Sequence, residues 1–168
     1  FRQMRNEEKR GHTLLTHVTL VPILEAVGEP KTKPTQHSVK ELRAIGLQPD
    51  IIAARIESGE LDVPQRRKIA LYCSVEEKAV FSSINVTTLY ELPLELESQG
   101  MGDVICEYLG LNGVEPKWSE WRKMVKTFKE PTDMVKIAMC GKYAELADCY
   151  VSVNEALRHS AAKSGCKV

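Results

Sequence analysis

This 168-residue sequence has no net charge, because its 23 basic residues equal its 23 acidic residues. A chain without a net field gives no reason to expect binding to nucleic acid or to a membrane surface, so any anion site has to come from a local cluster of cations. The sequence also lacks an apolar run near the roughly 20 residues of a membrane helix, and it lacks a charged-then-apolar leader. We therefore expect a cytoplasmic protein that binds neither nucleic acid nor membrane.

Paired cysteines are also missing. The five cysteines stand at positions 73, 106, 140, 149 and 166, an odd number without a Cys-x-x-Cys pair, which argues against a disulfide framework and against a zinc site. Cys73, Cys106 and Cys140 lie among apolar neighbours, and we expect them to be buried thiols. The four histidines have no metal-ligand spacing, and no Gly-x-x-x-x-Gly-Lys phosphate loop or internal repeat occurs.

Apolar, β-branched runs alternate with helical periodicity in the first half of the chain. The pattern predicts strands over residues 14–21, 50–54 and 79–83, and helices over residues 38–45 and 64–73. This order is typical of an α/β fold with a parallel sheet and crossover helices. Ligands of such sheets bind beyond the carboxyl ends of the strands.

The second half of the chain is predicted to be mainly helical, with a domain boundary between the helices. We expect residues 86–111 to be helical, with breaks at Pro93 and Gly100. Gly, Asn and Pro cluster over residues 112–116 and predict a domain boundary there. After this boundary the pattern predicts a helix over 118–128, a strand over 135–141 and a helix over 148–163. One βα unit is too small to be a domain, so we expect it to continue past Val168. The predicted division is residues 1–111, a linker over 112–133, and residues 134–168.

The segment from Lys31 to Ser38 concentrates two lysines, two threonines and a glutamine directly before a predicted helix. Ammonium groups, neutral side-chain donors and the N–H groups of a helix N-terminus together suit a phosphate. Ser38 and Glu41 fit a capping box, with Thr35 as an alternative cap. Composition alone also fits a solvated turn, so both interpretations stand at this point.

The run Lys31-Thr32-Lys33-Pro34-Thr35-Gln36 resembles the KTKPTQ signature of CTP synthases. The resemblance extends in order through residues 17–22, 38–43, 46–51, 68–73, 99–100 and 141–143, and so covers essentially the whole chain. It implies the carboxyl-terminal part of a P-loop-type amidoligase domain, a linker helix, and the first βα unit of a class I glutaminase domain. It also identifies the chain, which starts abruptly at Phe1, as an internal piece of a longer protein.

The resemblance to CTP synthases implies an activity, the ATP-dependent amination of UTP to CTP with ammonia from glutamine. It implies ATP as co-substrate, CTP as feedback inhibitor, GTP as effector, Mg²⁺ with ligands outside this chain, and a homotetramer that in some members forms filaments. The glutaminase nucleophile and its partners are expected beyond Val168. No catalytic residue is therefore expected in this chain, and the chain alone should be inactive.

Eleven positions match residues that the family uses to bind nucleotides. The resemblance implies a UTP or CTP site made of Lys31, Thr32, Lys33, Pro34, Thr35, Gln36 and Lys68, and an ATP site made of Arg55, Ile84, Asn85 and Val86.

Three of these positions leave alternatives open. An extra residue after Arg55 makes Arg66 and Arg67 competitors for the role of Lys68, which also fits a solvated helix charge. Arg55 fits a surface ion pair as well as an ATP contact. Asn85 stands where the family usually has Asp, which puts nucleotide preference in doubt if the carboxylate matters.

Two other functions remain as alternatives to a CTP synthase. One is another glutamine-dependent amidoligase of related fold. The other is a nucleotide-binding regulatory or filament-forming module without catalysis, for which the amphipathic helix over 118–128 offers a contact surface, although packing also explains that helix.

Overall fold

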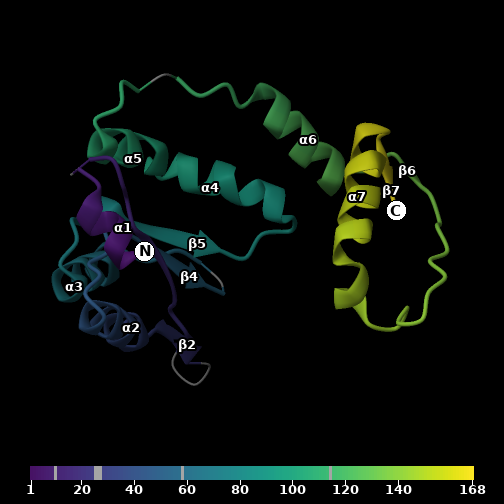
Figure 1. The fold of residues 1–168 in the computed structure, drawn as a ribbon. Coiled ribbons are helices and arrows are strands. Elements are labelled where there is room, and N and C mark those ends of the chain that lie inside the picture. The colour runs from purple at the N-terminus through teal and green to yellow at the C-terminus, as the bar shows by residue number, and fades with distance from the viewer. Residues whose placement is uncertain (10, 25–27, 58, 114) are drawn as a thin grey trace. The chain divides into compact units, whose positions relative to one another are not determined.

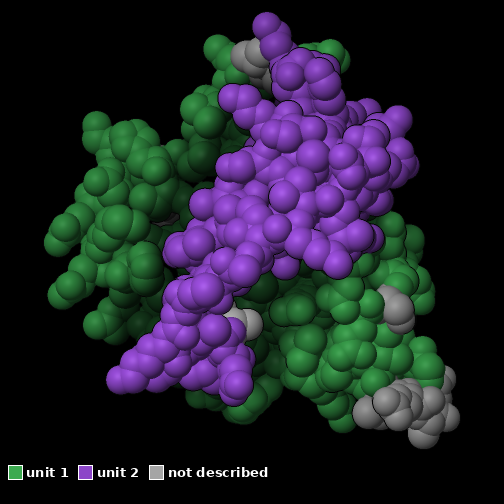
Figure 2. Space-filling model, turned by 90° about the vertical axis from the view of Figure 1, so that its right-hand side faces the viewer, with its two compact units in different colours: residues 1–86, 92–115 green, residues 87–91, 116–168 purple. Residues whose placement is uncertain are grey.

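The computed structural model describes residues 1–9, 11–24, 28–57, 59–113 and 115–168. The chain forms two compact units, residues 1–86 with 92–115 (unit 1) and residues 87–91 with 116–168 (unit 2), which Figure 2 colours green and purple. The predicted boundary over 112–116 includes Val114, which lies outside the described residues. The predicted division into domains stays a prediction, and each unit is described by itself below.

Unit 1 is built on a parallel sheet of strand order β1-β4-β5. Helices α2 and α3 lie on one face of this sheet and helices α4 and α5 on the other (Figure 1). Its elements are α1 (Arg2–Glu7), β1 (Thr16–Leu20), β2 (Ile23–Leu24), β3 (Glu29–Pro30), α2 (Lys33–Ala44), β4 (Ile51–Ile56), α3 (Val63–Cys73), η1 (Glu77–Ala79), β5 (Val80–Ile84), α4 (Leu92–Ser98) and α5 (Met101–Leu109).

The central strand β4 is buried on both faces, as expected for the middle of a parallel sheet covered by helices. Ile52 and Ile56 pack on the side of α2 and α3, where Val39 joins them. Ile51 points to the other side and packs with Val104 of α5. The three predicted parallel strands and the predicted helix over 64–73 are confirmed, with ends within two residues of the prediction.

The helical region after β5 differs partly from the prediction. Gly100 separates α4 from α5 in a left-handed conformation (φ 81°), which confirms the expected break there. Pro93 does not break a helix, because it is the second residue of α4, where a missing N–H costs no helical hydrogen bond.

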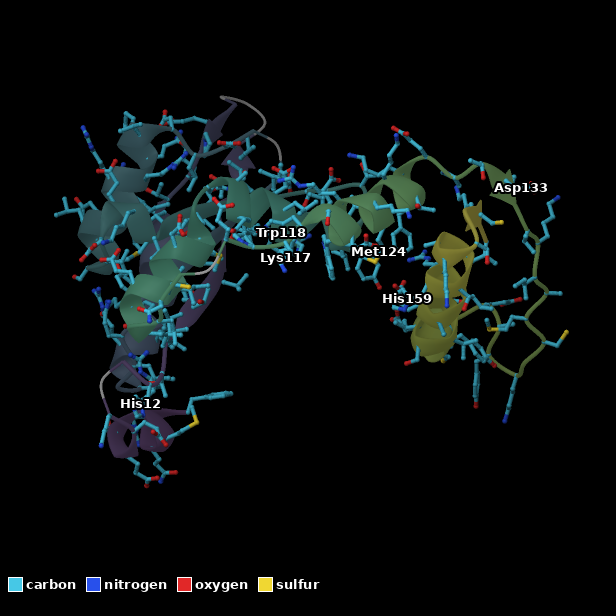
Figure 3. The ribbon with its side chains drawn as sticks, turned by 90° about the horizontal axis from the view of Figure 1, so that it is seen from above. His12, Lys117, Trp118, Met124, Asp133 and His159 are labelled. Carbon is cyan, nitrogen blue, oxygen red and sulfur yellow. The ribbon has the colours of Figure 1, made fainter. Side chains whose placement is uncertain are left out.

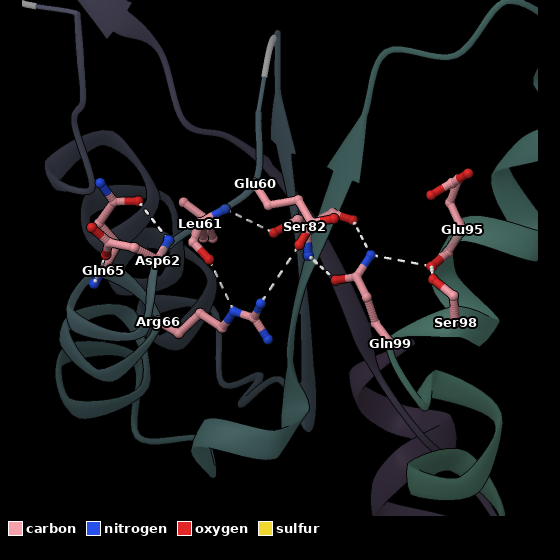
Figure 4. Close-up of polar contacts among 9 residues, drawn as sticks. All are labelled: Glu60, Leu61, Asp62, Gln65, Arg66, Ser82, Glu95, Ser98 and Gln99. Atoms are coloured by element: carbon pink, nitrogen blue, oxygen red, sulfur yellow. Dashed lines mark hydrogen bonds and ion pairs between the residues drawn. The ribbon is translucent and has the colours of Figure 1, made fainter.

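The outer edge of β5 is closed by one side chain. The Nε2 of Gln99 donates to the Ser82 carbonyl at 2.9 Å, and the Ser82 N–H donates to the Oε1 of Gln99 at 2.8 Å (Figure 4). The side-chain amide thus pairs with the same two groups that a neighbouring strand would use. The Ser82 hydroxyl, which is fully buried, accepts a hydrogen bond from the Leu61 N–H at 3.0 Å. Gln99 and Ser82 therefore fix β5 between α4 and the start of α3.

Replacing Gln99 by Met should release this edge, because a side chain of similar size without an amide leaves both Ser82 backbone groups unpaired. We expect a loss of about 1–3 kcal/mol in local stability. Hydrogen exchange of the Ser82 amide in the full-length protein measures it, with Gln3→Met on the exposed face of α1 as control. Equal protection of the Ser82 amide in Gln99→Met and in the unchanged protein would contradict this role.

Unit 2 joins two helices to a short parallel pair of strands. Its elements are η2 (Leu89–Glu91), α6 (Ser119–Lys129), β6 (Asp133–Met134), η3 (Ala147–Tyr150), α7 (Val151–Lys163) and β7 (Cys166–Lys167). Both predicted helices are confirmed. Among the described residues, no helix is long and apolar enough to cross a membrane.

The predicted strand over 135–141 is wrong. Only β6 pairs with β7, and one further hydrogen bond runs from the Val135 N–H to the Lys167 carbonyl. A strand needs a partner along its length, and β7, which stands at the end of the sequence given, offers only two residues. Cys140, expected to be buried there, is exposed, and Cys106 is only partly buried, whereas Cys73 is buried as predicted.

Residues 87–91 are held in unit 2 by the side chain of Tyr90. Its ring stacks on Phe128 with centroids 4.8 Å apart, and its hydroxyl donates to the Oε2 of Glu155 at 2.9 Å. The Trp121 indole N–H donates to the Tyr90 carbonyl at 2.6 Å. The hydrogen bond from Tyr90 is the first cause that lowers the pKa of the Glu155 carboxyl. One residue thereby connects the segment after β5 with both α6 and α7.

Candidate functional site

The predicted nucleotide-binding residues of three segments lie at the same edge of the sheet. In the parallel register Leu20 stands beside Arg55, and Arg55 stands beside Ser83. All three strands end within two residues of this row, so the segments that follow β1, β4 and β5 emerge together. Such a carboxyl edge is where open parallel sheets bind their ligands.

The loop over 31–36 enters this edge through a short hairpin. Strands β2 and β3 pair antiparallel, and the Lys31 N–H donates to the Pro22 carbonyl at 2.9 Å, just beyond the end of β1. Helix α2 then starts at Lys33, with Thr32 as N-cap and Pro34 in the first turn. No side chain caps the first N–H groups of α2. These groups add a partial positive charge beside Lys31 and Lys33.

The predicted helix start at Ser38 is wrong, and so are both predicted caps. Pro34 fits the first turn because its missing N–H would have no helical partner there, so the helix starts five residues earlier. Ser38 lies inside α2, where its Oγ hydrogen-bonds the Nε2 of His17 at 2.8 Å. Burial lowers the pKa of His17, which favours the neutral imidazole in this contact.

The two threonines of the loop are buried. The fully buried Thr35 donates from its Oγ1 to the Leu20 carbonyl at 3.2 Å and accepts from the Thr19 hydroxyl at 3.4 Å. Thr32 accepts a hydrogen bond from the Nε2 of Gln36 at 3.1 Å. In this structure the Thr35 hydroxyl therefore positions the start of α2 against the end of β1.

Three lysines bring positive charge to the loop, with different partners. The Nζ of Lys31 lies 2.5 Å from the Oε2 of Glu29. Lys33 and Lys68 are exposed, and the side chain of neither forms a hydrogen bond or ion pair with a residue that the structure describes. The charge of Lys68 nevertheless contributes to lowering the pKa of the Glu29 carboxyl, so Lys68 of α3 acts on the same hairpin.

The two arginines that compete with Lys68 are already paired. Arg66 donates from its Nε to the Leu61 carbonyl at 3.1 Å and lies 3.8 Å from Glu60 (Figure 4). The Nε of Arg67 donates to the Oε2 of Glu77 at 3.1 Å. The structure thus favours Lys68 over Arg66 and Arg67 as the cation that a ligand would find unoccupied.

Arg55 is the exposed residue of an otherwise buried strand. It lies on the sheet face opposite α2 and α3, next to Leu20, which is 51% exposed. Within the described chain it has no ion pair, so the predicted surface pair of Arg55 does not form here. Ile84 ends β5 and packs partly against the core, and Asn85 after it is exposed. Of the four predicted ATP positions, Arg55 and Asn85 are therefore exposed and Ile84 and Val86 are partly buried, and their role stays a prediction.

Two cavities in the described part of the chain lie apart from the predicted nucleotide positions, and no cluster of metal-binding side chains lies there. The described residues bring together no group of three or more His, Cys, Asp or Glu side chains that could hold a metal ion. A cavity of about 460 Å³ in unit 1 is lined by Arg5, Asp50 and Tyr108 and lies at the amino ends of the strands. A second cavity, of about 830 Å³, lies in unit 2 between α6 and α7, where Met124 and His159 line it (Figure 3). Neither cavity includes a predicted site residue.

Two residues near the loop were missed by the sequence analysis. Glu29 stands two positions before Lys31, and in extended chain this spacing places both side chains on one side. That signal was available in the sequence. His17 and its contact with Ser38 had no local signal, because they depend on how β1 packs against α2.

This arrangement defines a class of protein, a parallel α/β domain whose carboxyl edge carries lysines around a helix N-terminus and can hold phosphate groups. The family model for the CTP synthase N-terminus matches residues 1–111. This chain belongs to the CTP synthase family.

Curated relatives agree over nearly the whole chain. The CTP synthase of Thermococcus kodakarensis is 51% identical over 167 residues, which are 99% of this chain and 31% of the relative. Those of Dehalococcoides mccartyi and Pyrococcus abyssi are 51% and 50% identical, over 98% and 99% of the chain. The chain spans just under a third of the length of these relatives.

Replacing Thr35 by Val should weaken the fold at the base of the loop, because the Leu20 carbonyl and the Thr19 hydroxyl lose their buried partner. The expected cost is about 1–3 kcal/mol in the free energy of unfolding. The midpoint of urea unfolding of the full-length protein measures it, with Thr87→Val at an exposed position as control. If both variants unfold at the same urea concentration, the Thr35 hydroxyl does not hold the start of α2.

Proposed function

We propose that this chain supplies the pyrimidine-triphosphate loop and part of the ATP site of a CTP synthase. The observation that carries the proposal is the register of β1, β4 and β5, together with family membership. The register gathers Lys31, Lys33, Arg55 and the residues after Ile84 at one edge. The lysines would bind the triphosphate of UTP, or of CTP as inhibitor, and Arg55 with residues 84–86 would contact ATP.

The proposed reaction joins two anionic substrates. ATP transfers its terminal phosphoryl group to O4 of UTP and leaves as ADP. Ammonia released from glutamine then attacks C4, and the phosphate leaves with the C4–O4 bonding pair. Two triphosphates repel one another, so the site needs cations and oriented N–H donors that stay in place during transfer. Lys31, Lys33, Lys68 and the start of α2 would supply them for UTP.

The rest of the machinery is assigned to other parts of the full-length protein. Mg²⁺ is part of the proposal, but the described residues provide no ligand set for it, so no step is assigned to the metal here. We place the glutaminase nucleophile outside this chain as well, and we propose that the chain alone is inactive. Regulation by GTP, a homotetramer and a cytoplasmic location complete the proposal.

Replacing Lys33 by Ala in the full-length protein should weaken UTP and CTP together, because a lysine on a shared triphosphate cannot distinguish the bases. A charge-assisted hydrogen bond contributes about 1.5–3 kcal/mol, so we expect at least a tenfold rise in both dissociation constants. Isothermal titration calorimetry measures them, and Lys40→Ala on the exposed surface of α2 is the matched control. Unchanged affinity for both nucleotides would contradict the assignment of the loop.

Lys68 and Arg67 provide a second comparison on one helix. Lys68→Ala should raise the Michaelis constant for UTP severalfold, whereas Arg67→Ala should leave it unchanged, because Arg67 already pairs with Glu77. Steady-state kinetics with free ammonia as nitrogen donor isolate this effect from glutamine hydrolysis. The opposite ranking would assign the nucleotide contact to Arg67.

A further inference from the structure

Glu29 pairs with one of the lysines of the cationic loop. Its Oε2 lies 2.5 Å from the Nζ of Lys31, and both side chains are partly exposed, Glu29 at 59% and Lys31 at 36%. The pair joins the end of the hairpin to the segment that leads into α2. A carboxylate oxygen and a phosphate oxygen are alternative acceptors for the same ammonium group.

The carboxylate also lies in the field of a second lysine. The pKa of Glu29 is lowered first by its hydrogen bond with Lys31, then by the charge of Lys31, and further by the charge of Lys68. Two of the three lysines assigned to the triphosphate therefore act on one protein carboxylate, while Lys33 pairs with no residue among those described. The Glu29 carboxylate of the hairpin is thus a negative charge of the protein itself beside the candidate site.

We propose that Glu29 is a built-in counter-ion of the loop, which the phosphates of a nucleoside triphosphate displace from Lys31 on binding. The proposal rests on the proposed function of the loop. Without nucleotide, the pair holds the Lys31 side chain beside the start of α2. When phosphate binds, the carboxylate loses its partner and repels the ligand. Glu29 therefore limits the affinity for nucleotide.

The number of phosphate groups distinguishes this role from an ordinary surface ion pair. A repelling carboxylate acts more strongly on a triphosphate than on a monophosphate, because the interaction scales with the ligand's charge. A residue that merely supports the hairpin would change the affinity for every uridine nucleotide by the same factor. The test is therefore a comparison across UTP, UDP and UMP.

The experiment measures dissociation constants of full-length Glu29→Gln by calorimetry. Gln keeps the size of the side chain and removes its charge. We expect UTP to bind about three- to tenfold more tightly than to the unchanged protein, with smaller gains for UDP and UMP, and we expect these gains to shrink as salt is raised. Glu77→Gln is the matched control, because it removes the same charge from an exposed ion pair with Arg67.

Each outcome decides one claim. Weaker UTP binding, or an equal factor for all three nucleotides, overturns the counter-ion role of Glu29. The same gain in Glu77→Gln would also overturn it, because the effect would then come from net charge. If the unchanged protein binds no UTP, the proposed function itself fails. If it binds UTP and Glu29→Gln does not alter the affinity, only the counter-ion role fails.

Discussion

The parallel, in-register pairing of β1, β4 and β5 is the constraint on which the candidate site depends. The row Leu20, Arg55 and Ser83 fixes where each strand stops, and thereby where the hairpin, the segment before α3 and the residues after Ile84 begin. A slip of one residue would turn Arg55 toward α2 and α3, where Ile52, Ile56 and Val39 form a buried apolar cluster. The buried faces of β4 prevent that slip, so packing far from any ligand sets the geometry of the edge.

Hydrogen bonds between β1 and α2 hold the loop over 31–36 in place relative to the sheet. Thr35 connects α2 to the last carbonyl of β1, and His17 connects β1 to Ser38 one turn later. On the other side of the sheet, Gln99 takes the place of a missing neighbour of β5. Because these side chains hold the elements together, Lys33 and Lys68 take no part in the packing around the loop, whereas Lys31 pairs with Glu29. The residues that fix the fold at this edge are therefore different from the lysines that we propose to bind phosphate.

The parts that the sequence predicted well are those controlled by local patterns. Three apolar runs became the three strands of the sheet, and Asp62 and Gln65, unnoticed in the sequence, form the capping box that starts α3. The start of α2 was misplaced because Pro34 looked like part of a loop, although its ring suits a first helical turn. The strand over 135–141 failed because periodicity cannot reveal whether a partner strand exists. The site positions came from a family motif, and the partners of Thr35 and Lys31 depended on tertiary packing.

The most direct measurement of the central claim is an experimental structure of the full-length protein with UTP and a non-hydrolysable ATP analogue. Our interpretation predicts the UTP triphosphate within hydrogen-bonding distance of Lys31, Lys33 and Lys68, with the Glu29 carboxylate turned away from Lys31. It predicts the ATP analogue near Arg55 and residues 84–86. A UTP triphosphate bound away from the carboxyl edge of the sheet, with the Lys31 and Glu29 pair intact, would contradict it.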